Sequence, residues 1–334
     1  MSTEPIVESM TPVTLDARKA VLAAIGAHER FLLVTHEHPD GDALGSLIGM
    51  QALLRGLGKD SLMVISPDDF PLPGEYRFFA LDGLVTSPPE DFELRTVVFL
   101  DCGNLDRNPL AVLRGAGELV NIDHHHDNTR FGTINYVVEG ASCTAEIVWD
   151  LMHVAGVEMS TEVAEALYVG LVTDTGRFSY ENTTIRAHEM AVELIAAGVD
   201  VAEMYRRIYE GVPLAKLRLL ARALDGVALY SDDRLAVAVL GIADFEAAGA
   251  EASQSEGIID HLRALAGVKV AVLIRELSGE GQQGLRKVSL RATDNDVDVS
   301  MIARTHGGGG HRRAAGFTSG LSTAELIDAI RAQV

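Results

Sequence analysis

The strongest constraint on the fold is a repeated pattern in which a short apolar run ends abruptly in acids or histidines. The runs at 31–35, 96–100 and 119–122 lead, respectively, into His36-Glu37-His38-Pro39-Asp40-Gly41-Asp42, Asp101, and Asp123-His124-His125-His126. Uninterrupted apolar runs of this length are typical of strands buried on both faces. Helical spacing between them, as in residues 44–57, indicates that strands alternate with helices. This alternation predicts an α/β fold with a parallel, doubly wound sheet.

The polar residues that follow these strands predict a metal site. Parallel strands bring their carboxyl ends to one edge of the sheet, which is where ligands bind in open α/β sheets. Asp174, at the end of a helix expected to start near Thr161, is a fourth contribution. A single strand-end aspartate is usually a helix cap or a turn former. Three strand ends with imidazole and carboxylate groups instead favour a divalent ion of the manganese, magnesium or iron kind.

The pattern changes after about residue 226. A hairpin is expected around 231–233, further strands at 269–276 and 285–292, and a closing amphipathic helix at 321–334. These elements predict a smaller α/β domain with a mixed sheet. We therefore expect a metal-binding catalytic domain at 1–195, a helical connector at 196–225 and a substrate-binding domain at 226–334, with the active site in the cleft between the two domains.

Charge and composition restrict the partners. The formal net charge of the 334 residues is −20, which argues against long duplex nucleic acid as a partner, because such binding depends on cationic side chains. A short anionic substrate held by metal ions and a few local cations is still compatible with this charge. Two cysteines are too few for a disulfide scaffold. No signal-peptide pattern opens the chain and no apolar run reaches the roughly 18 residues of a membrane span, so we expect a cytoplasmic protein without a membrane partner. A homodimer is left open.

One stretch in the second half of the chain carries a net positive charge, although the chain as a whole is acidic. Residues 284–318 contain six Lys or Arg against three acids, a local charge of +3, and four consecutive glycines, Gly307–Gly310. Consecutive glycines let the backbone approach a ligand closely and can direct N–H groups at an anion. No Gly-Lys-Ser/Thr follows, so this is not a P-loop. A phosphate clamp is the favoured interpretation and a flexible linker is the alternative.

Taken together, these segments resemble the DHH family of phosphoesterases, which is named for the triplet found here as Asp123-His124-His125. His36-x-x-x-Asp40-x-Asp42 is similar to the first motif of the family, Asp101 to the second and Asp174 to the fourth. Gly308-Gly309-Gly310-His311-x-x-Ala314-Ala315-Gly316 is similar to the signature of the DHH-associated C-terminal domain. Length and this signature most resemble the branch of nanoRNases and pAp phosphatases.

The resemblance implies a site with two divalent ions, with Mn²⁺ the expected metal. His36 and Asp40 would hold one ion, Asp42 and His124 the other, and Asp101 and Asp174 would be shared. Asp123 is placed to accept a hydrogen bond from a metal-binding histidine. His125 would contact the scissile phosphate and protonate the leaving oxygen, with a buried structural histidine as the alternative. In the second domain the implied substrate contacts are Arg291, Gly308, Gly309, Gly310 and His311.

The expected reaction is metal-dependent hydrolysis of phosphoester bonds in small nucleotides. Candidate substrates are very short oligoribonucleotides, pAp, and linear or cyclic dinucleotides. One alternative is a pyrophosphatase or polyphosphatase of the same superfamily, which the glycine-rich second domain disfavours. Another is a non-catalytic nucleotide sensor, which is disfavoured because all six implied metal ligands are present.

Overall fold

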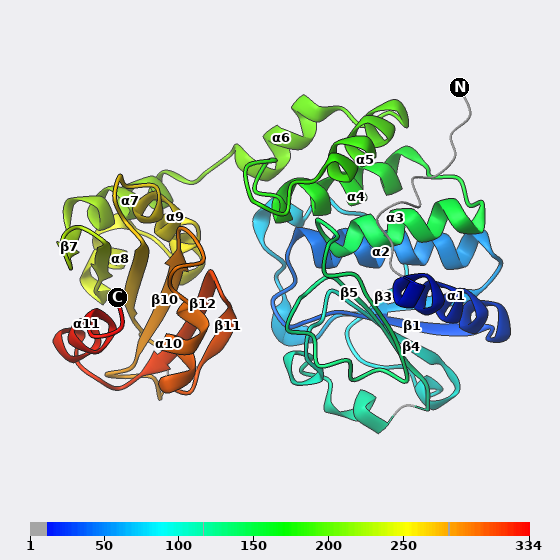
Figure 1. Ribbon diagram of the computed structural model, residues 1–334, viewed down its shortest axis with the longest axis horizontal. Coiled ribbons are helices and arrows are strands. Elements are labelled where there is room, and N and C mark those ends of the chain that lie inside the picture. Colours follow the sequence, from blue (N-terminus) through cyan, green and yellow to red (C-terminus); the bar gives the residue numbers. More distant parts are fainter. Residues whose placement is uncertain (1–11, 116, 280) are drawn as a thin grey trace. The chain divides into compact units, whose positions relative to one another are not determined.

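The computed structural model of the chain describes residues 12–115, 117–279 and 281–334. The chain divides into two compact units, Met1–Glu210 and Gly211–Val334 (Figure 1). The stretch expected as a connector contains α6 (Val201–Tyr209), in the first unit, and α7 (Leu214–Asp225), in the second. The expected domain limits and the cleft between the domains remain predictions.

The first unit contains a sheet of six parallel strands in the order β3-β2-β1-β4-β5-β6. The strands are β1 (Arg30–Val34), β2 (Asp60–Val64), β3 (Leu84–Val85), β4 (Thr96–Leu100), β5 (Leu119–Asp123) and β6 (Ile134–Val137). The order reverses between β1 and β4, which are neighbours although they are distant in sequence. In doubly wound sheets ligands bind at this switch point. The prediction of a parallel, doubly wound sheet is confirmed.

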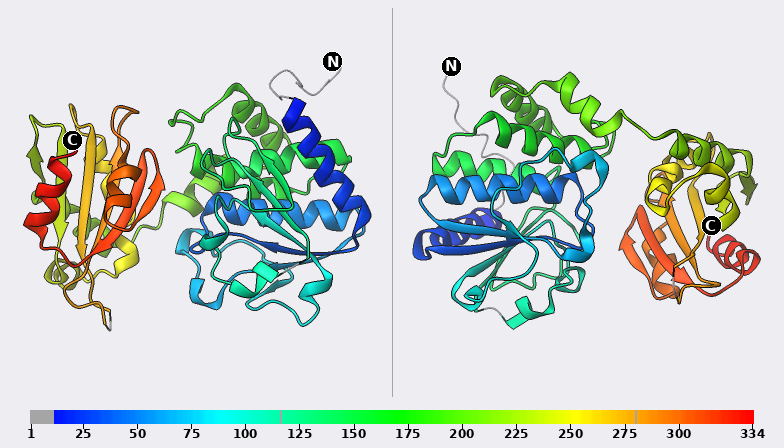
Figure 2. Two further views of the ribbon diagram at one scale, coloured as in Figure 1. Left: turned by 60° about the horizontal axis from the view of Figure 1, so that its bottom comes forward. Right: turned by 180° about the vertical axis from the view of Figure 1, so that it is seen from behind.

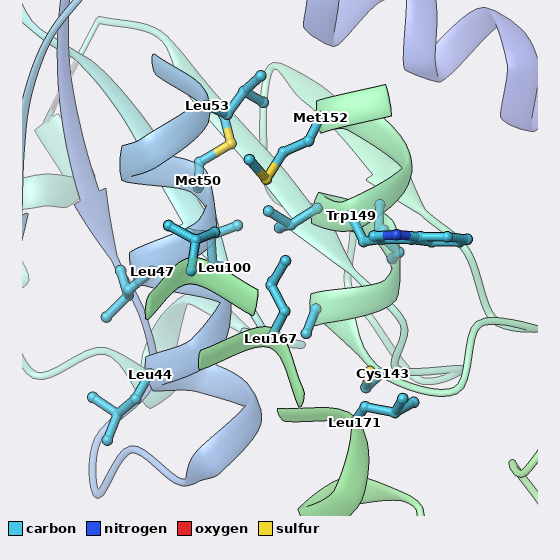
Figure 3. Close-up of a cluster of buried hydrophobic side chains, with 14 of the residues drawn as sticks. Leu44, Leu47, Met50, Leu53, Leu100, Cys143, Trp149, Met152, Leu167 and Leu171 are labelled. Atoms are coloured by element: carbon cyan, nitrogen blue, oxygen red, sulfur yellow. The ribbon is translucent and has the colours of Figure 1, made fainter. Parts of the chain in front are cut away.

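Helices cover one face of this sheet. They are α1 (Pro12–Ala27), α2 (Gly41–Gly56), α3 (Thr144–Ala155), α4 (Thr161–Asp174), α5 (Ile185–Ala196) and α6. Figure 3 shows that side chains of α2, α3 and α4 converge in one core, among them Leu47, Met152 and Leu167. On the other face Val97 and Phe99 of β4 belong to a second buried cluster, so β4 is apolar throughout because both of its faces are covered.

Short 3-10 helices lie in the connections: η2 (Pro67–Asp69), η3 (Gly74–Tyr76), η4 (Phe92–Leu94), η5 (Leu105–Arg107), η6 (Ala111–Gly115) and, in the second unit, η7 (Ala252–Ser255). Within the described residues, no helix combines the length and apolarity that a membrane span requires.

The second unit has a mixed sheet in the order β11-β12-β10-β9-β8-β7. Its strands are β7 (Ala228–Tyr230), β8 (Leu235–Leu240), β9 (Val270–Glu276), β10 (Arg286–Ala292), β11 (Gly309–His311) and β12 (Ala314–Ser319). Strands β8 and β9 pair in parallel and the other neighbours are antiparallel. The prediction of a mixed sheet is confirmed.

Both faces of the second sheet are covered by helices, as Figure 2 shows, where α11 is red and α9 is yellow. One buried cluster joins the sheet to α10 (Val299–Thr305) and α11 (Thr323–Arg331). Another joins its opposite face to α7, α8 (Ile242–Ala248) and α9 (Ile258–Arg263). This unit therefore has its own core.

Candidate metal centre

The six predicted metal ligands come from five places in the chain and lie together at one edge of the first sheet. His36 follows β1, Asp40 and Asp42 stand at the start of α2, Asp101 follows β4, His124 follows β5, and Asp174 ends α4. They form two groups, one of His36, Asp40 and Asp101 and one of Asp42, His124 and Asp174, with the donor atoms of each group within 4.8 Å of one another. Asp101 also groups with His124 and His125, so it connects the two sets. Asp174 belongs only to the second group, whereas the resemblance implied that both ions share it.

Backbone carbonyls orient the two predicted histidine ligands. His36 Nδ1 lies 2.7 Å from the carbonyl oxygen of Glu37, and His124 Nδ1 lies 3.3 Å from that of Ala141. A carbonyl oxygen only accepts, so Nδ1 carries the hydrogen in each ring. In the neutral ring, Nε2 is then the nitrogen with a free lone pair. It faces the carboxylates, 3.5 Å from Asp101 Oδ2 for His36 and 3.7 Å from Asp174 Oδ2 for His124. This arrangement fixes the tautomer that a metal ligand needs.

Asp40 combines two roles. As the N-cap of α2, its Oδ1 accepts hydrogen bonds of 3.1 Å from the N–H groups of Asp42 and Ala43. These bonds explain why α2 begins at Gly41 rather than near residue 44, as the apolar spacing alone indicated. The other oxygen, Oδ2, lies 4.0 Å from His36 Nε2. Asp40 therefore caps the helix with one oxygen and offers the second to the site.

The remaining carboxylates accept hydrogen bonds from three residues that the sequence analysis did not identify. The N–H groups of Thr144 and Ala145 donate to Asp42 at 2.7 and 2.8 Å, and the Thr144 hydroxyl donates to Asp101 at 3.1 Å. Asn182 Nδ2 donates to Asp174 Oδ2 at 3.0 Å. Helix α3 was not predicted from the sequence. Its N-cap residue makes no side-chain capping bond, so the start of the helix carries no capping signal. The signal available for it was the helical spacing of apolar residues that starts at Ala145 and stops at Gly156.

The site has an excess of buried negative charge. Burial, and then repulsion from Asp101 and Asp174, raise the pKa of Asp42 well above its ordinary value. Burial likewise raises the pKa of Asp174 to about 6, although the nearby charge of His124 opposes this. Burial would lower the pKa of His124, but the charges of Asp174, Asp101 and Asp42 raise it to about 9. Burial of Asp42 and Asp174, and the closeness of several carboxylates, thus favour the protonated forms of these three groups.

The pKa of Asp101 is lowered, whereas those of Asp42 and Asp174 are raised. Burial alone would raise the pKa of Asp101, but His36, when it is protonated on both nitrogens, and the charges of the other histidines outweigh burial and hold this pKa well below the ordinary range. Asp101 is thus the carboxylate that stays ionised most readily. With imidazole and carboxylate donors only, and with too little positive charge, the residues fit a pair of divalent cations.

His125 is oriented by a buried acid. Its Nδ1 donates to Asp123 Oδ1 at 2.7 Å, and Asp123, whose side chain is fully buried, also accepts a bond from Asn128. Asp123 was expected to serve a metal-binding histidine, but the histidine it contacts is His125. Burial would lower the pKa of His125, yet the hydrogen bond that it donates to Asp123 and the charge of Asp101 raise it. His125 is therefore built to carry a proton beside the metal ligands.

In the second unit the predicted substrate contacts lie on β10 and on β11 with the residue before it, and β12 separates these two strands. Arg291 of β10 and His311 of β11 are both paired with Ala314 of β12, from opposite sides. Their backbones are therefore two strands apart in one row of the sheet, or roughly 10 Å. The Arg291 guanidinium donates to the carbonyl of Leu290 at 3.1 Å.

Of the predicted glycines, Gly308 precedes β11, and Gly309 and Gly310 lie in it. The surroundings of these three residues differ. A Cβ at Gly308 would lie 2.2 Å from the carbonyl oxygen of Gly316, and one at Gly310, where φ is +134°, would lie 2.5 Å from that of Ala314. A Cβ at Gly309 would meet nothing within 4 Å. Gly308 and Gly310 are thus required by close packing against β12, and Gly309 is not.

Comparison with known proteins agrees with both units. The model of the DHH family, N-terminal domain, matches residues 30–171, and that of the DHHA1 domain matches residues 232–334. The bifunctional oligoribonuclease and PAP phosphatase NrnA of Thermus thermophilus is 35% identical over 287 residues, which cover 86% of this chain and 83% of the relative. The Bacillus subtilis protein of the same name is 28% identical over 302 residues, or 89% and 91% of the two chains.

Solved structures share the fold. An exopolyphosphatase-related protein from Bacteroides fragilis superposes with a TM-score of 0.87 at 23% identity, over 97% of each chain. RecJ from Thermus thermophilus, in complex with Mn²⁺, superposes with a TM-score of 0.57 at 15% identity, over 98% of this chain and 55% of RecJ. The DHH model spans five of the six predicted metal ligands and the DHHA1 model spans the C-terminal glycine signature, and together with the 35% identity to NrnA this shows that the chain belongs to the DHH family of phosphoesterases.

Proposed function

We propose that the chain is a phosphoesterase, dependent on Mn²⁺, that hydrolyses the phosphoester bonds of small nucleotides. Very short oligoribonucleotides and pAp are the main substrates in this proposal, and linear and cyclic dinucleotides are further candidates. The observation that carries it is the pair of ligand groups connected by Asp101, with the proton-carrying His125 beside them. The names of the two NrnA relatives support the substrate class, and the Mn²⁺ of RecJ supports the choice of ion.

The residues divide the chemistry between them. His36, Asp40 and Asp101 would hold one ion, and Asp42, His124 and Asp174 the other. When bound, the ions would polarise a phosphoryl oxygen and make a water molecule more acidic. Because His125 Nδ1 is engaged by Asp123, proton transfer to the leaving oxygen would use Nε2. Asp123 would stabilise the protonated ring and keep it in one orientation.

The second unit would supply recognition. In this proposal Arg291, Gly308, Gly309, Gly310 and His311 hold a terminal phosphate or nucleotide of the substrate. The register of the sheet supports it, since Arg291 and His311 are both paired with Ala314, from opposite sides. A chain of net charge −20 has little cationic surface on which a longer strand could lie. Substrates are therefore expected to be short.

A substrate panel tests the proposal. Dinucleotides, oligoribonucleotides of increasing length, pAp, cyclic dinucleotides, pyrophosphate and polyphosphate would be assayed with Mn²⁺ and after chelation. We expect hydrolysis of dinucleotides and pAp, a steep fall with length, loss of activity on chelation and recovery with Mn²⁺. Preference for pyrophosphate or polyphosphate, nucleotide binding without turnover, or full activity in metal-free protein would each contradict the proposal.

A further inference from the structure

One short segment, Ser142–Ala145, connects three carboxylates of the metal centre, the buried Asp42 and Asp101 and the partly exposed Asp174. Two of its N–H groups, those of Thr144 and Ala145, bind the two oxygens of Asp42. Both groups belong to the first turn of α3, where N–H groups have no partner within the helix. Asp42 thus receives two donors from a helix that lies about a hundred residues further along the chain.

The same segment reaches the other two carboxylates through side chains. The Thr144 hydroxyl donates to Asp101 Oδ1 at 3.1 Å. Asn182 donates both to the carbonyl oxygen of Ser142, at 2.7 Å, and to Asp174 Oδ2, at 3.0 Å. Asp42, Asp101 and Asp174 come from three different elements, namely α2, the end of β4 and the end of α4, and this segment is linked to all three.

The segment is itself held from behind. The Ser142 N–H donates to Glu146 Oε2 at 3.0 Å, and Glu146 pairs with Arg186 of α5 at 3.2 Å. The Ser142 hydroxyl lies 3.2 Å from that of Thr184. Ser142 and Thr144 are fully buried. A buried support of this kind needs little reorganisation when the charge at the metal centre changes, because its hydrogen-bond donors are already oriented.

We propose that Thr144 is a positioning residue that sets the affinity of the first unit for divalent cations, by holding Asp42 and Asp101 at the spacing a metal pair requires, and that Asn182 does the same for Asp174. The three carboxylates repel one another, so in the absence of fixed donors they would separate or take up protons. Either change would have to be reversed before a cation could bind. This inference rests on the proposed function only in that it takes the carboxylates to be metal ligands.

The test compares three variants in the full-length chain. Thr144→Val keeps the shape of the side chain and the N–H bond to Asp42 but removes the hydroxyl bond to Asp101, and Thr144→Ser restores that hydroxyl. The matched control is Thr183→Val, because within the described residues the buried Thr183 hydroxyl has no hydrogen-bond partner. Affinity for Mn²⁺ alone would be measured by titration calorimetry. We expect a loss of roughly 10–100-fold for Thr144→Val, as is usual for residues that support metal ligands, and near wild-type affinity for Thr144→Ser and Thr183→Val.

Wild-type Mn²⁺ affinity in Thr144→Val would overturn the inference, and so would equal losses in Thr144→Val and Thr183→Val. Should Thr144→Val not fold, as judged by circular dichroism, Asn182→Ala gives the same test at Asp174 from a position outside the helices, and wild-type affinity there would overturn the inference. Because the readout is metal binding, it is independent of turnover. A protein that binds Mn²⁺ tightly but hydrolyses no nucleotide would contradict the proposed function and leave the positioning role measurable.

Discussion

The two units carry their predicted functional residues in different ways. In the first unit these residues contact one another, as in the approach of His36 to Asp101 at 3.5 Å and the bond between His125 and Asp123 at 2.7 Å. In the second unit the described contacts are with backbone: Arg291 donates to the carbonyl of the adjacent Leu290, and Gly308 and Gly310 pack against β12. The residues of the first site are therefore positioned by contacts with one another, whereas those of the second are positioned by the backbone of the sheet.

This difference follows from the two kinds of sheet. The parallel sheet collects the ends of β1, β4 and β5 at one edge, so residues that follow these strands must meet. The antiparallel strands β10, β12 and β11 instead place Arg291 and His311 in a row across the sheet. We therefore expect substitutions in the first unit to affect metal binding and turnover, and substitutions in the second to affect substrate affinity.

The largest effect is expected for Asp101→Ala and Asp174→Ala. Each removes a carboxylate that belongs to a ligand group, so metal occupancy should fall and turnover should be abolished, a greater loss than the roughly 10–100-fold typical of supporting residues. Elemental analysis and single-turnover rates would measure this. Asp106→Ala, which removes an exposed aspartate bound to Arg114, is the control. Full metal occupancy in Asp101→Ala would mean that the ligand set is misassigned.

His125→Ala should separate metal binding from chemistry within the first unit. We expect both metals to be retained while kcat falls by roughly 10²–10⁴, the usual contribution of a positioned acid–base group. His126→Ala, at the adjacent exposed histidine, should change kcat little and serves as the control. If the His125 variant loses a metal ion, the residue is a ligand rather than a proton donor.

Arg291→Ala tests the role assigned to the second unit. A charge-assisted hydrogen bond to a substrate is worth about 1.5–3 kcal/mol, so KM for dinucleotides should rise roughly 10–150-fold. Metal binding should be unchanged. Lys287→Ala, at an exposed position of the same strand, controls for the loss of a positive charge. An unchanged KM in the Arg291 variant, or equal hydrolysis of dinucleotides and of strands of about twenty nucleotides, would refute the clamp.

The smallest effect, and one on stability, is expected from the glycines. Gly308→Ala puts a Cβ against the backbone of β12 and should lower the free energy of unfolding by about 1–3 kcal/mol, as overpacking does. Gly309→Ala has open space and should leave stability within about 0.5 kcal/mol of wild type. Urea denaturation of the two variants would measure the difference. Equal destabilisation would show that Gly309 is also a packing residue, whereas a raised KM in Gly309→Ala alone would support contact with substrate.

The sequence indicated that the predicted metal ligands would meet because three of the contributing segments directly follow strands of one parallel sheet. His36 and Asp101 follow uninterrupted apolar runs, and runs of that kind leave little choice of structure. The predicted strand at 96–100 matches β4 in full, and those at 269–276 and 285–292 match β9 and β10 to within one residue. The parallel arrangement of the first sheet then brings its strand ends together without further information.

The support behind the ligands could not be predicted in this way. Thr144 lies beside Asp42 only because α3 packs next to α2, and Asn182 lies beside Asp174 only because the loop after α4 returns to the end of that helix. No local sequence pattern encodes either contact. In the second unit, the sequence analysis interpreted the glycine run as part of a phosphate clamp. The structure adds an internal reason at Gly308 and Gly310, which depends on β12, a strand that the sequence pattern did not indicate.

The order of the strands has a consequence for how the protein folds. The residues that would hold the ions span positions 36 to 174, and they meet only when β1, β4, β5, α2 and α4 are all in place. A divalent ion that binds the complete set therefore stabilises only forms of the chain in which all five of these elements are assembled. Occupancy by metal would thus report on the assembly of this part of the first unit, and it would be lost when α2 or α4 detaches.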